Sequence, residues 1–311
     1  MRSTPLYIFL ALIIASCSGG SDNPSTPTQP SISGTISGDG DVAGITVHIN
    51  NSSVVTDQNG NYSAEVSNGT YEVVPEEDGY LFEPERRTVV VSDAPQESVD
   101  FIGQTTSDIM AFNLSWNLLN PSVQNVEENT SSKLNLALAQ NALWYEGSQG
   151  GLVYRYIKGN FTLSATVSVR KTSDEASAVE CDICLGGLMA RNPSSSQGQN
   201  YVHIVSGNTP QGLGYETKNT RSSQSPFEAT GDGTTDHDLR ICRDGSTFRL
   251  YQRAVGTSNW SLAATYERPD LPATLQVGFN IYTAQTGAVA DLRTIFENVT
   301  LQTFTDSPGC Q

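Results

Sequence analysis

The feature that most constrains this fold is a two-residue alternation of apolar and polar side chains, which recurs in short runs along most of the chain. Ile45, Val47 and Ile49 alternate with polar neighbours, which is the period of a strand with one buried face. The Asn-Gly pair in the segment 57–61 suits the positive φ angles of a tight hairpin. The one candidate for a helix, residues 133–143, places its first leucines at alternate positions. The sequence therefore predicts an all-β protein.

We expect the segment 31–104 to form one small β module. Tyr71 and Val73 alternate with polar residues, and Val89 begins a continuous β-branched run. The segment resembles the carboxypeptidase regulatory-like, or prealbumin-like, sandwich domain through a series of motifs: Ile32-Ser33-Gly34, the turn and strand from Asp57 to Tyr62, Gly69-Thr70-Tyr71, Gly79-Tyr80-Leu81-Phe82-Glu83-Pro84 and Val99-Asp100-Phe101. The resemblance implies a non-catalytic spacer or adhesion domain.

The larger remainder, 105–311, is also all-β by its pattern. Short strand-like runs are separated by turns rich in Gly and Asn, which indicates a two-sheet sandwich or jelly roll. The runs are Lys133 to Ala139, Phe161 to Val169, Gly186 to Ala190, Tyr201 to Val205, Leu239 to Ile241, Phe248 to Tyr251, Leu275 to Ile281 and Leu292 to Leu301.

A series of motifs in this remainder points to one family. In chain order they are Leu152-Val153-Tyr154-Arg155-Tyr156, Gly159-Asn160-Phe161, Gly186-Gly187-Leu188-Met189-Ala190-Arg191, Leu239-Arg240-Ile241, Arg243-Asp244-Gly245 with Phe248, Trp260 and Val277-Gly278-Phe279. Over residues 110–303 the chain resembles the concanavalin A-like domain of unknown function that also forms the C-terminal part of some β-xylosidases. The resemblance implies a jelly-roll β-sandwich with a concave sheet, frequently attached to carbohydrate-active enzymes.

The amino terminus carries an apolar run, Leu6 to Ala15, after one positive charge at Arg2. The run has signal-peptide length and is too short to span a bilayer, which needs about 20 apolar residues. It closes on Ile14-Ala15-Ser16-Cys17, which resembles the lipobox of bacterial lipoproteins. The resemblance implies cleavage before Cys17, a diacylglycerol thioether on its thiol, and a membrane anchor outside the cytoplasm. An ordinary secretory signal and an uncleaved N-terminal anchor are the alternatives.

These patterns divide the chain into a signal peptide (1–17), a flexible linker (18–30), a small sandwich (31–104) and a larger one (105–311). The linker consists mostly of Ser, Thr, Pro, Gly, Asn and Asp, which leaves too little apolar content to order it. The lipoprotein resemblance implies the outer membrane, because Ser18 and not Asp follows the cysteine. We therefore expect a lipid-anchored protein of the cell envelope that faces either the periplasm or the outside.

The acidic composition of the chain disfavours polyanionic partners. Its 33 acidic and 17 basic side chains give a formal net charge of −16. Such a charge disfavours binding to nucleic acid and to anionic lipid headgroups. The favoured explanation for the charge is that it keeps a secreted protein soluble.

Apart from Cys17, the chain has four cysteines: Cys181, Cys184, Cys242 and Cys310. An even number in an oxidising compartment predicts two disulfides, and three pairings are open. A four-thiolate zinc site is the alternative, but only the first two cysteines have the CxxC spacing. We expect one disulfide to tie Cys310 back to the body.

The strongest hint of catalysis is Glu180-Cys181-Asp182-Ile183-Cys184, which resembles the Glu-x-Asp-x-Glu strand of laminarinase-type hydrolases. Alternation would place positions 180, 182 and 184 on one face of a strand. The third position is a cysteine, however, and no second carboxylate stands in register for a retaining mechanism. The favoured interpretation makes Glu180 and Asp182 turn or strand-entry residues, so we expect a protein that is not an enzyme.

A metal site is conceivable at one place. His237 lies among Asp232, Asp236 and Asp238, and oxygen ligands of this kind suit calcium. A solvated acidic loop is the favoured interpretation. We therefore expect no cofactor and no metal, with calcium as the one possibility.

Carbohydrate binding needs aromatic faces that stack on sugar rings and planar polar groups that recognise hydroxyls. Arg191 ends one predicted strand, and Tyr201 and His203 alternate at the start of the next, which allows the three to share a sheet face. The candidate ligand-binding residues are Trp144, Tyr145, Arg191, Asn192, Tyr201, His203 and Tyr215, with Trp260 as a further aromatic candidate. A place in the core is the alternative for each aromatic, above all for Trp260, and a surface position is the alternative for His203.

The sequence thus predicts a membrane-anchored, extracytoplasmic lipoprotein that binds a polysaccharide or other glycan without cleaving it. One alternative is a glycan-processing hydrolase or lyase of the concanavalin A-like fold. Another is a purely structural or adhesive surface protein.

Overall fold

The computed structural model describes most of the chain beyond the predicted linker, in the ranges 29–38, 40–78, 80–105, 109–110, 116–130, 132–144, 150–194, 196–305 and 310. The predicted signal peptide 1–17 with Cys17, the linker residues 18–28 and Tyr145 lie outside the described residues. All regular elements in the described ranges are β-strands. These ranges contain no helix long and apolar enough to cross a membrane.

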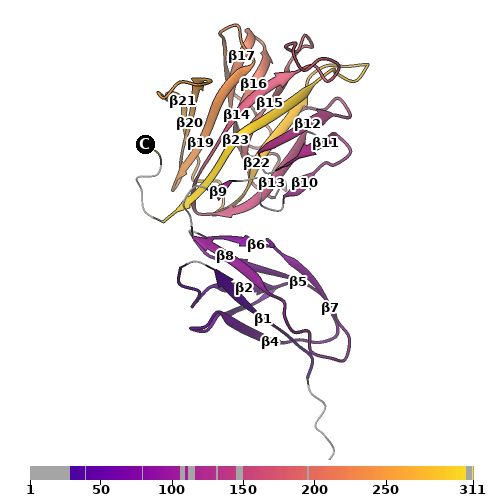
Figure 1. Cartoon of the computed structure of the whole chain (residues 1–311), viewed down its shortest axis with the longest axis vertical. Coiled ribbons are helices and arrows are strands. Elements are labelled where there is room, and N and C mark those ends of the chain that lie inside the picture. Colours follow the sequence, from indigo (N-terminus) through magenta and orange to yellow (C-terminus); the bar gives the residue numbers. More distant parts are fainter. Residues whose placement is uncertain are drawn as a thin grey trace, which may run out of the picture.

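The first sandwich consists of two four-stranded sheets and lies below the larger sandwich in Figure 1. Its strands are β1 (Ser31–Gly38), β2 (Thr46–Ile49), β3 (Ser52–Val55), β4 (Asn61–Glu65), β5 (Gly69–Glu76), β6 (Tyr80–Glu83), β7 (Arg87–Val91) and β8 (Phe101–Thr105). One sheet has the order β4-β1-β8-β6 and the other β3-β2-β5-β7. Ile32 and Phe101 from the first sheet meet Val47 and Val73 from the second in one core.

The second sandwich is built from a seven-stranded and an eight-stranded sheet (Figure 1). Its strands are β9 (Ile109–Met110), β10 (Asn117–Leu119), β11 (Gln124–Asn129), β12 (Lys133–Leu138), β13 (Gly151–Lys158), β14 (Asn160–Arg170), β15 (Cys184–Arg191), β16 (Tyr201–Thr209), β17 (Gly212–Thr220), β18 (Phe227–Gly231), β19 (Asp236–Asp244), β20 (Thr247–Ala254), β21 (Ser261–Glu267), β22 (Thr274–Thr283) and β23 (Arg293–Phe304).

The strand order places the core of the second sandwich between its two sheets. The seven-stranded sheet has the order β10-β13-β22-β15-β16-β17-β18, and the eight-stranded sheet has the order β11-β12-β23-β14-β19-β20-β21, with β9 paired to β23. Leu188 and Phe279 from the first of these sheets pack with Leu163 and Phe296 from the second. The predicted all-β fold, with a small sandwich before a larger one, is confirmed.

Sequence patterns locate some strands of the second sandwich better than others. Each of the strand-like runs predicted there overlaps a strand of the structure. By contrast, seven strands lie outside every predicted run: β9, β10, β11, β13, β17, β18 and β21. Gly212, Gly214 and several polar side chains make up much of β17, so its apolar alternation is too weak to indicate a strand.

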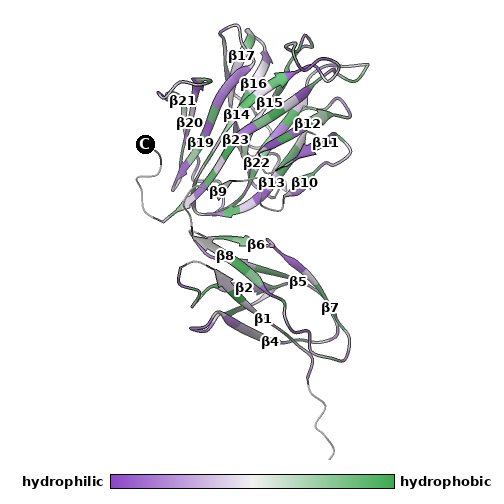
Figure 2. Cartoon of the chain, in the orientation of Figure 1, coloured by the Kyte–Doolittle hydropathy of each residue, from purple (hydrophilic) through white to green (hydrophobic). Residues whose placement is uncertain are grey.

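The central strands of the seven-stranded sheet, β13, β22, β15 and β16, are buried on both faces. All eight residues of β15 are buried, whereas a strand with one solvated face would alternate. Leu188 and Ala190 point into the core between the sheets, and Leu185 and Met189 pack in a separate cluster on the other side. We call that other side, turned away from the eight-stranded sheet, the front face. In Figure 2 hydrophobic and hydrophilic residues interchange along the strands of both sandwiches.

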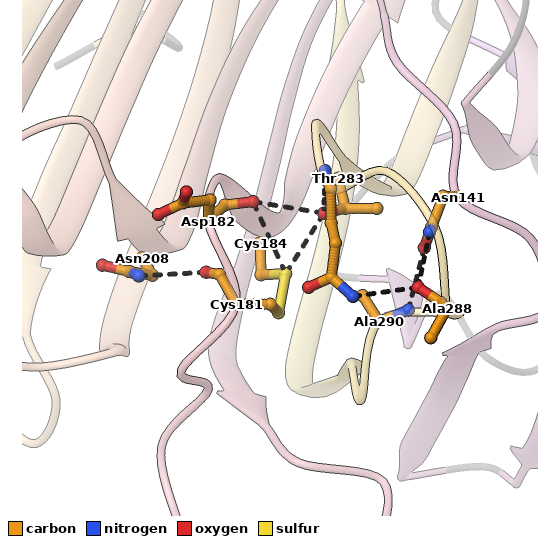
Figure 3. Close-up of a disulfide and its surroundings, with 9 residues drawn as sticks. Asn141, Cys181, Asp182, Cys184, Asn208, Thr283, Ala288 and Ala290 are labelled. Atoms are coloured by element: carbon orange, nitrogen blue, oxygen red, sulfur yellow. Dashed lines mark hydrogen bonds between the residues drawn. A yellow bond between two sulfur atoms is a disulfide. The ribbon is translucent and has the colours of Figure 1, made fainter.

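Two disulfides form, as predicted, and the structure selects the pairing Cys181–Cys184 and Cys242–Cys310. The second bond ties the C-terminal tail back to β19, which confirms that expectation. Figure 3 shows the first bond beside Thr283, whose Oγ1 lies 3.3 Å from the sulfur of Cys184.

The residues that suggested a hydrolase strand form a turn instead. β15 begins only at Cys184, so positions 180 and 182 precede the strand. The Glu180 side chain is 82% exposed and pairs with Lys171 at 2.7 Å. The interpretation of Glu180 and Asp182 as turn residues is therefore confirmed.

β6 joins the small sandwich to one end of the larger one. Leu81 on this strand is 3% exposed and belongs to the core of the larger sandwich. Arg155 on β13 is 1% exposed, and its guanidinium donates to Glu83 Oε2 at 3.1 Å and to the carbonyl of Phe82. A buried apolar side chain and a buried cation therefore hold the two sandwiches together.

Replacing Leu81 by alanine should weaken the larger sandwich although the residue belongs to the smaller one. We expect Leu81→Ala to lower its free energy of unfolding by about 2–4 kcal/mol, because the truncation leaves a cavity in that core. All three tryptophans of the chain, at positions 116, 144 and 260, lie in the larger module, so tryptophan fluorescence in urea measures its unfolding. Leu262→Ala is the control, since Leu262 is 56% exposed. Equal effects of the two variants would contradict the shared core.

Candidate functional site

The front face of the seven-stranded sheet carries three of the predicted ligand-binding residues. Arg191 lies opposite Tyr201 in the β15–β16 pair, and His203 follows two positions later, so their side chains share this face. They are 2%, 0% and 0% exposed, respectively. The surface position considered for His203 is therefore wrong, because the sheet is covered on both sides.

Arg191 is held by two buried side-chain amides. Its Nε donates to Gln199 Oε1 at 2.8 Å, and its Nη1 donates to Gln276 Oε1. Burial lowers the pKa of Arg191 and raises the pKa of its neighbour Tyr201. The guanidinium thus has a fixed position at the end of β15.

A buried charged cluster surrounds His203. Glu216 Oε1 accepts hydrogen bonds from Lys218 Nζ and from the Tyr282 hydroxyl, each at 3.1 Å. The same oxygen lies 3.5 Å from His203 Nε2, and Asn280 Nδ2 lies 3.4 Å from His203 Nδ1. Glu216 and Lys218 were not among the predicted site residues, because the weak apolar alternation of β17 did not indicate a strand.

The cluster keeps His203 neutral at physiological pH. Burial lowers the pKa of His203 from 6.5 to about 4, although the hydrogen bond with Glu216 acts in the opposite direction. Burial alone would raise the pKa of Glu216, but its hydrogen bond with His203 and the charge of Lys218 outweigh that effect and lower it. The cluster therefore combines a neutral imidazole with an ion pair.

The aromatic candidates are not free to stack on a sugar. Trp144 is 0% exposed and packs edge-on against Tyr201, with ring centroids 6.0 Å apart. Its Nε1 is buried and has no hydrogen-bond partner in the described part of the chain. Tyr215 alternates to the opposite side of β17, where its ring lies 5.5 Å from that of His237. The front-face cluster is thus a covered floor.

An open, polar hollow lies beyond the end of this floor, where β15 ends and β16 begins. We call it the loop cup. Its volume is about 410 Å³, and its lining residues are Asn192, Ser194, Ser196, Gln197, Asn200, Arg221, Ser222 and Asp270. They come from the β15–β16 loop, the β17–β18 connection and the segment before β22. Asn192 is the only predicted ligand-binding residue among them, and no aromatic residue of the described chain lines the cup.

Arg268, which is fully buried, fixes one wall of the loop cup. Its Nη1 donates to the carbonyl of Tyr201 at 2.9 Å and to Asn219 Oδ1 at 3.0 Å. Its Nη2 donates to Asp270 Oδ2 at 2.7 Å, and this bond lowers the pKa of Asp270. The cup therefore presents a carboxylate whose position is set by the sheet.

Backbone contacts fix the other walls. The amide of Ser222 donates to Asn200 Oδ1 at 2.9 Å, and the amide of Ser194 donates to Asn192 Oδ1 at 2.9 Å. Arg221, half exposed, lies 3.9 Å from Asp270. The loops are thus held in one arrangement while several polar atoms still face the hollow.

A second hollow, of about 310 Å³, lies between the two sandwiches. Its charged groups pair with one another, His48 with Glu76 at 2.9 Å and Arg86 with Glu72 at 2.5 Å. Arg86 also lies over the ring of Tyr156, 4.6 Å from its centroid. The two ion pairs lie within the small sandwich, and the contact of Arg86 with Tyr156 joins it to the larger one.

His237 is part of a buried hydrogen-bonded line and does not lie in a solvated loop, so that expectation is wrong. It belongs to β19 and is 1% exposed. Its Nδ1 lies 2.8 Å from Ser206 Oγ, and its Nε2 lies 2.9 Å from Asp232 Oδ2. Ser206 is 0% exposed, so no substrate reaches its hydroxyl. The line connects the two sheets through the core.

The aspartates next to His237 already have cationic partners. Asp236 accepts two hydrogen bonds from Arg170 Nη2, at 2.5 and 2.7 Å, and Asp238 accepts one from Arg253 Nε at 2.8 Å. Within the described residues no group of three or more His, Cys, Asp or Glu side chains is placed to hold a metal ion. Asp236 and Asp238 are thus engaged with guanidinium groups, and Asp232, the third carboxylate considered for calcium, pairs with His237 at 2.9 Å.

The sequence matches no protein-family model and no curated protein. The fold is similar to that of a functionally unknown protein from Saccharomyces cerevisiae, with a TM-score of 0.50, 15% identity, and coverage of 61% of this chain and 97% of that one. The exoplasmic/lumenal domain of VIP36, in its form bound to Ca²⁺ and Man2, gives a TM-score of 0.43 at 13% identity and covers 62% and 83%. A xylan β-1,4-xylosidase from Bacillus halodurans C-125 gives 0.47 at 12% identity and covers 80% and 52%.

At such identities these likenesses concern the fold alone. The two-sheet β-sandwich that the sequence predicted for the larger module is present in the structure, and its resemblance to the concanavalin A-like family stays a prediction. The resemblances to bacterial lipoproteins and to the carboxypeptidase regulatory-like domain stay predictions.

The buried imidazole predicts a pH dependence of stability. In the folded protein His203 has a pKa of about 4, against 6.5 for an ordinary histidine, so between these values the unfolded chain binds more protons and stability rises with pH. Wild type should lose about 2 kcal/mol more than His203→Gln between pH 7 and pH 4.5. Urea unfolding of both proteins at the two pH values measures this difference, and equal losses would contradict a neutral, buried His203.

Proposed function

We propose that this protein is a lipid-anchored protein of the bacterial cell envelope that binds a glycan in the loop cup without cleaving it. The observation that supports this function best is the cup itself, an open hollow of about 410 Å³ lined by polar side chains. Its volume is in the range of small-ligand sites.

The chemistry of the cup suits sugar hydroxyls, which donate and accept hydrogen bonds at once. Gln197 supplies a side-chain amide with donors and an acceptor, and Asn192 supplies the donors of an amide whose oxygen accepts from Ser194. Asp270 supplies an acceptor and Arg221 a planar set of donors. Because the cup is held by hydrogen bonds within the chain, little conformational entropy is lost when a ligand binds.

The arrangement of carboxylates supports binding without cleavage. Asp270 is the only carboxylate among the described residues that line the cup. A retaining glycosidase needs two carboxyl groups about 5–5.5 Å apart, and an inverting one needs two at about 6.5–9.5 Å. The serine of the Ser206–His237 pair is buried in the core, so it supplies no nucleophile at the cup.

The binding function is tested with a variant of the cup. We expect Arg221→Ala, in the detergent-solubilised full chain, to weaken retention on the polysaccharide that wild type binds by about tenfold, because a charged hydrogen-bond donor is lost. Affinity gel electrophoresis measures this retention. Arg249→Ala is the matched control, since Arg249 has a similarly exposed side chain that pairs only weakly, with Asp244 at 3.8 Å.

Two results would contradict the proposed binding role. Equal retention of the Arg221 and Arg249 variants would place the ligand elsewhere. Release of new reducing ends from the bound polysaccharide by wild type would identify a hydrolase, which was the alternative predicted from the sequence.

The membrane anchor is proposed from the lipobox sequence that ends at Cys17. Two or three acyl chains would hold the protein on a bilayer durably, since each buried methylene contributes about 0.8 kcal/mol. The Pro- and Thr-rich linker 18–30 would then separate the small sandwich from the lipid surface. Ser18, the residue that follows Cys17, suggests the outer membrane.

Metabolic labelling with an alkyne fatty acid tests the anchor. Wild type should carry the label and fractionate with the outer membrane, whereas Cys17→Ser should carry none. Ser18→Asp is the matched control, which should keep the label and move to the inner membrane. A labelled Cys17→Ser variant would rule out lipidation at this thiol.

A further inference from the structure

We propose that the larger sandwich has a second saccharide-binding site, for an uncharged sugar unit, on the outer face of the eight-stranded sheet. We call this side, turned away from the seven-stranded sheet, the back face. It contains a hollow of about 310 Å³, which we call the tryptophan pocket. Six of its lining residues form the proposed site: Ser164, Thr166, Asp238, Arg253, Trp260 and Asn298.

The strand register brings the polar residues of this pocket together. Thr166 on β14 lies opposite Asp238 on β19, and Asp238 lies opposite Arg253 on β20. The pairing of β14 with β23 contains a β-bulge, because the register of the two strands shifts between Ser164 and Thr166. β-bulges of this kind reorient side chains and are frequent beside functional sites.

The bulge places Asn298 at the edge of the pocket. Its φ of 50° lies in the left-handed region, which asparagine adopts more readily than most residues other than glycine. Its Nδ2 donates to Thr166 Oγ1 at 3.2 Å. A sparsely populated backbone conformation in the middle of a sheet is thus retained where it directs an amide at the pocket.

A chain of hydrogen bonds orients the polar side chains that line the pocket. Thr166 Oγ1 accepts from Asn298 and donates to Asp238 Oδ1 at 2.6 Å, and Arg253 Nε donates to Asp238 Oδ2 at 2.8 Å. Among the described residues, Asn298 Oδ1 and Arg253 Nη2 have no hydrogen-bond partner. One free acceptor and one free donor therefore flank the pocket, as a sugar hydroxyl pair requires.

Trp260 supplies the apolar wall. The sequence favoured a place in the core, but the side chain is only partly buried and lies at the surface of the back face. The guanidinium carbons of Arg240 and Arg253 lie 4.1 and 4.3 Å from its ring centroid. Two cation–π contacts of this kind hold the indole in place, and indole surfaces pack well against the C–H groups of sugars.

The cluster is unfavourable as a purely structural feature. Arg240 Nε is buried and has no hydrogen-bond partner in the described chain, where Arg240 also makes no ion pair. Burial, and the like charge of Arg253, lower the pKa of Arg240. Two neighbouring cations that share one aromatic ring, one of them without a carboxylate partner, repel each other, and perturbed ionisable groups of this kind cluster at functional sites.

The charges that line the pocket favour an uncharged ligand. Asp238 and Arg253 are the charged lining residues, and they pair with each other. The carboxylate of an acidic sugar would approach Asp238, whose side chain is 9% exposed and poorly screened. Hydroxyl groups would instead meet a donor, an acceptor and an indole wall.

The test is affinity gel electrophoresis of the detergent-solubilised full chain. The gels contain one of four neutral polymers: hydroxyethyl cellulose, galactomannan, laminarin or glycogen. Gels with polygalacturonate provide the comparison with a charged polymer. We expect Trp260→Ala to reduce retention by a neutral polymer about tenfold. Asn298→Gly should act in the same direction, since glycine keeps the positive φ and removes only the amide. Leu262→Ala, which removes exposed apolar surface from the adjoining strand β21, should change nothing.

Each variant is made in wild type and in the Arg221→Ala background. This design distinguishes loss of binding at the loop cup from loss of binding at the tryptophan pocket. Loss of all retention in Arg221→Ala alone would overturn the second site and leave the loop cup. Loss caused only by the Trp260 and Asn298 variants would support the second site and overturn the cup. Unchanged retention in both of these variants, no retention by any neutral polymer, or retention by polygalacturonate alone would overturn this proposal. Circular dichroism of Asn298→Gly confirms that lost retention is not lost folding.

Discussion

The burial of the central strands of the seven-stranded sheet on both faces is the constraint on which the rest of the structure depends. Polar side chains on its front face cannot be solvated, so they need partners within the protein. Glu216 gains Lys218 and Tyr282, and Arg191 gains two glutamines. Arg268 extends this network to the loops by bonding the carbonyl at the start of β16. The loop cup is therefore built on a floor whose side chains have no freedom to rearrange.

The small sandwich braces the same end of the sheet. Gln276 on β22 lies opposite both Arg191 and Tyr156 in the strand register. Two residues before it, Thr274 Oγ1 donates to Glu76 of the small sandwich at 2.8 Å. The strand ends that lead into the cup are thus the ends that the small sandwich contacts.

Sequence patterns predicted the fold well and the site only in part, for physical reasons. Alternation identifies strands such as β14 because one of its faces is apolar, but β17 carries charged residues on a buried face and gave no such signal. His203 was assigned to the surface as an alternative because burial on both faces of a sheet cannot be inferred from one strand. The loop cup consists of small polar residues from three loops, and only Asn192 adjoined a recognised strand. Trp260 was assigned to the core because an indole is usually buried.

The positions of the two proposed sugar sites determine how they would act together. Because the tryptophan pocket lies on the eight-stranded sheet and the cup lies at the end of the seven-stranded one, a short oligosaccharide in one site cannot reach the other. A second binding event then gains effective concentration only when one polymer chain is long enough to pass around the sandwich. Each site can therefore be weak while the protein holds a polysaccharide firmly. A short ligand would gain nothing from the second site, so retention should depend on chain length more steeply than one site allows.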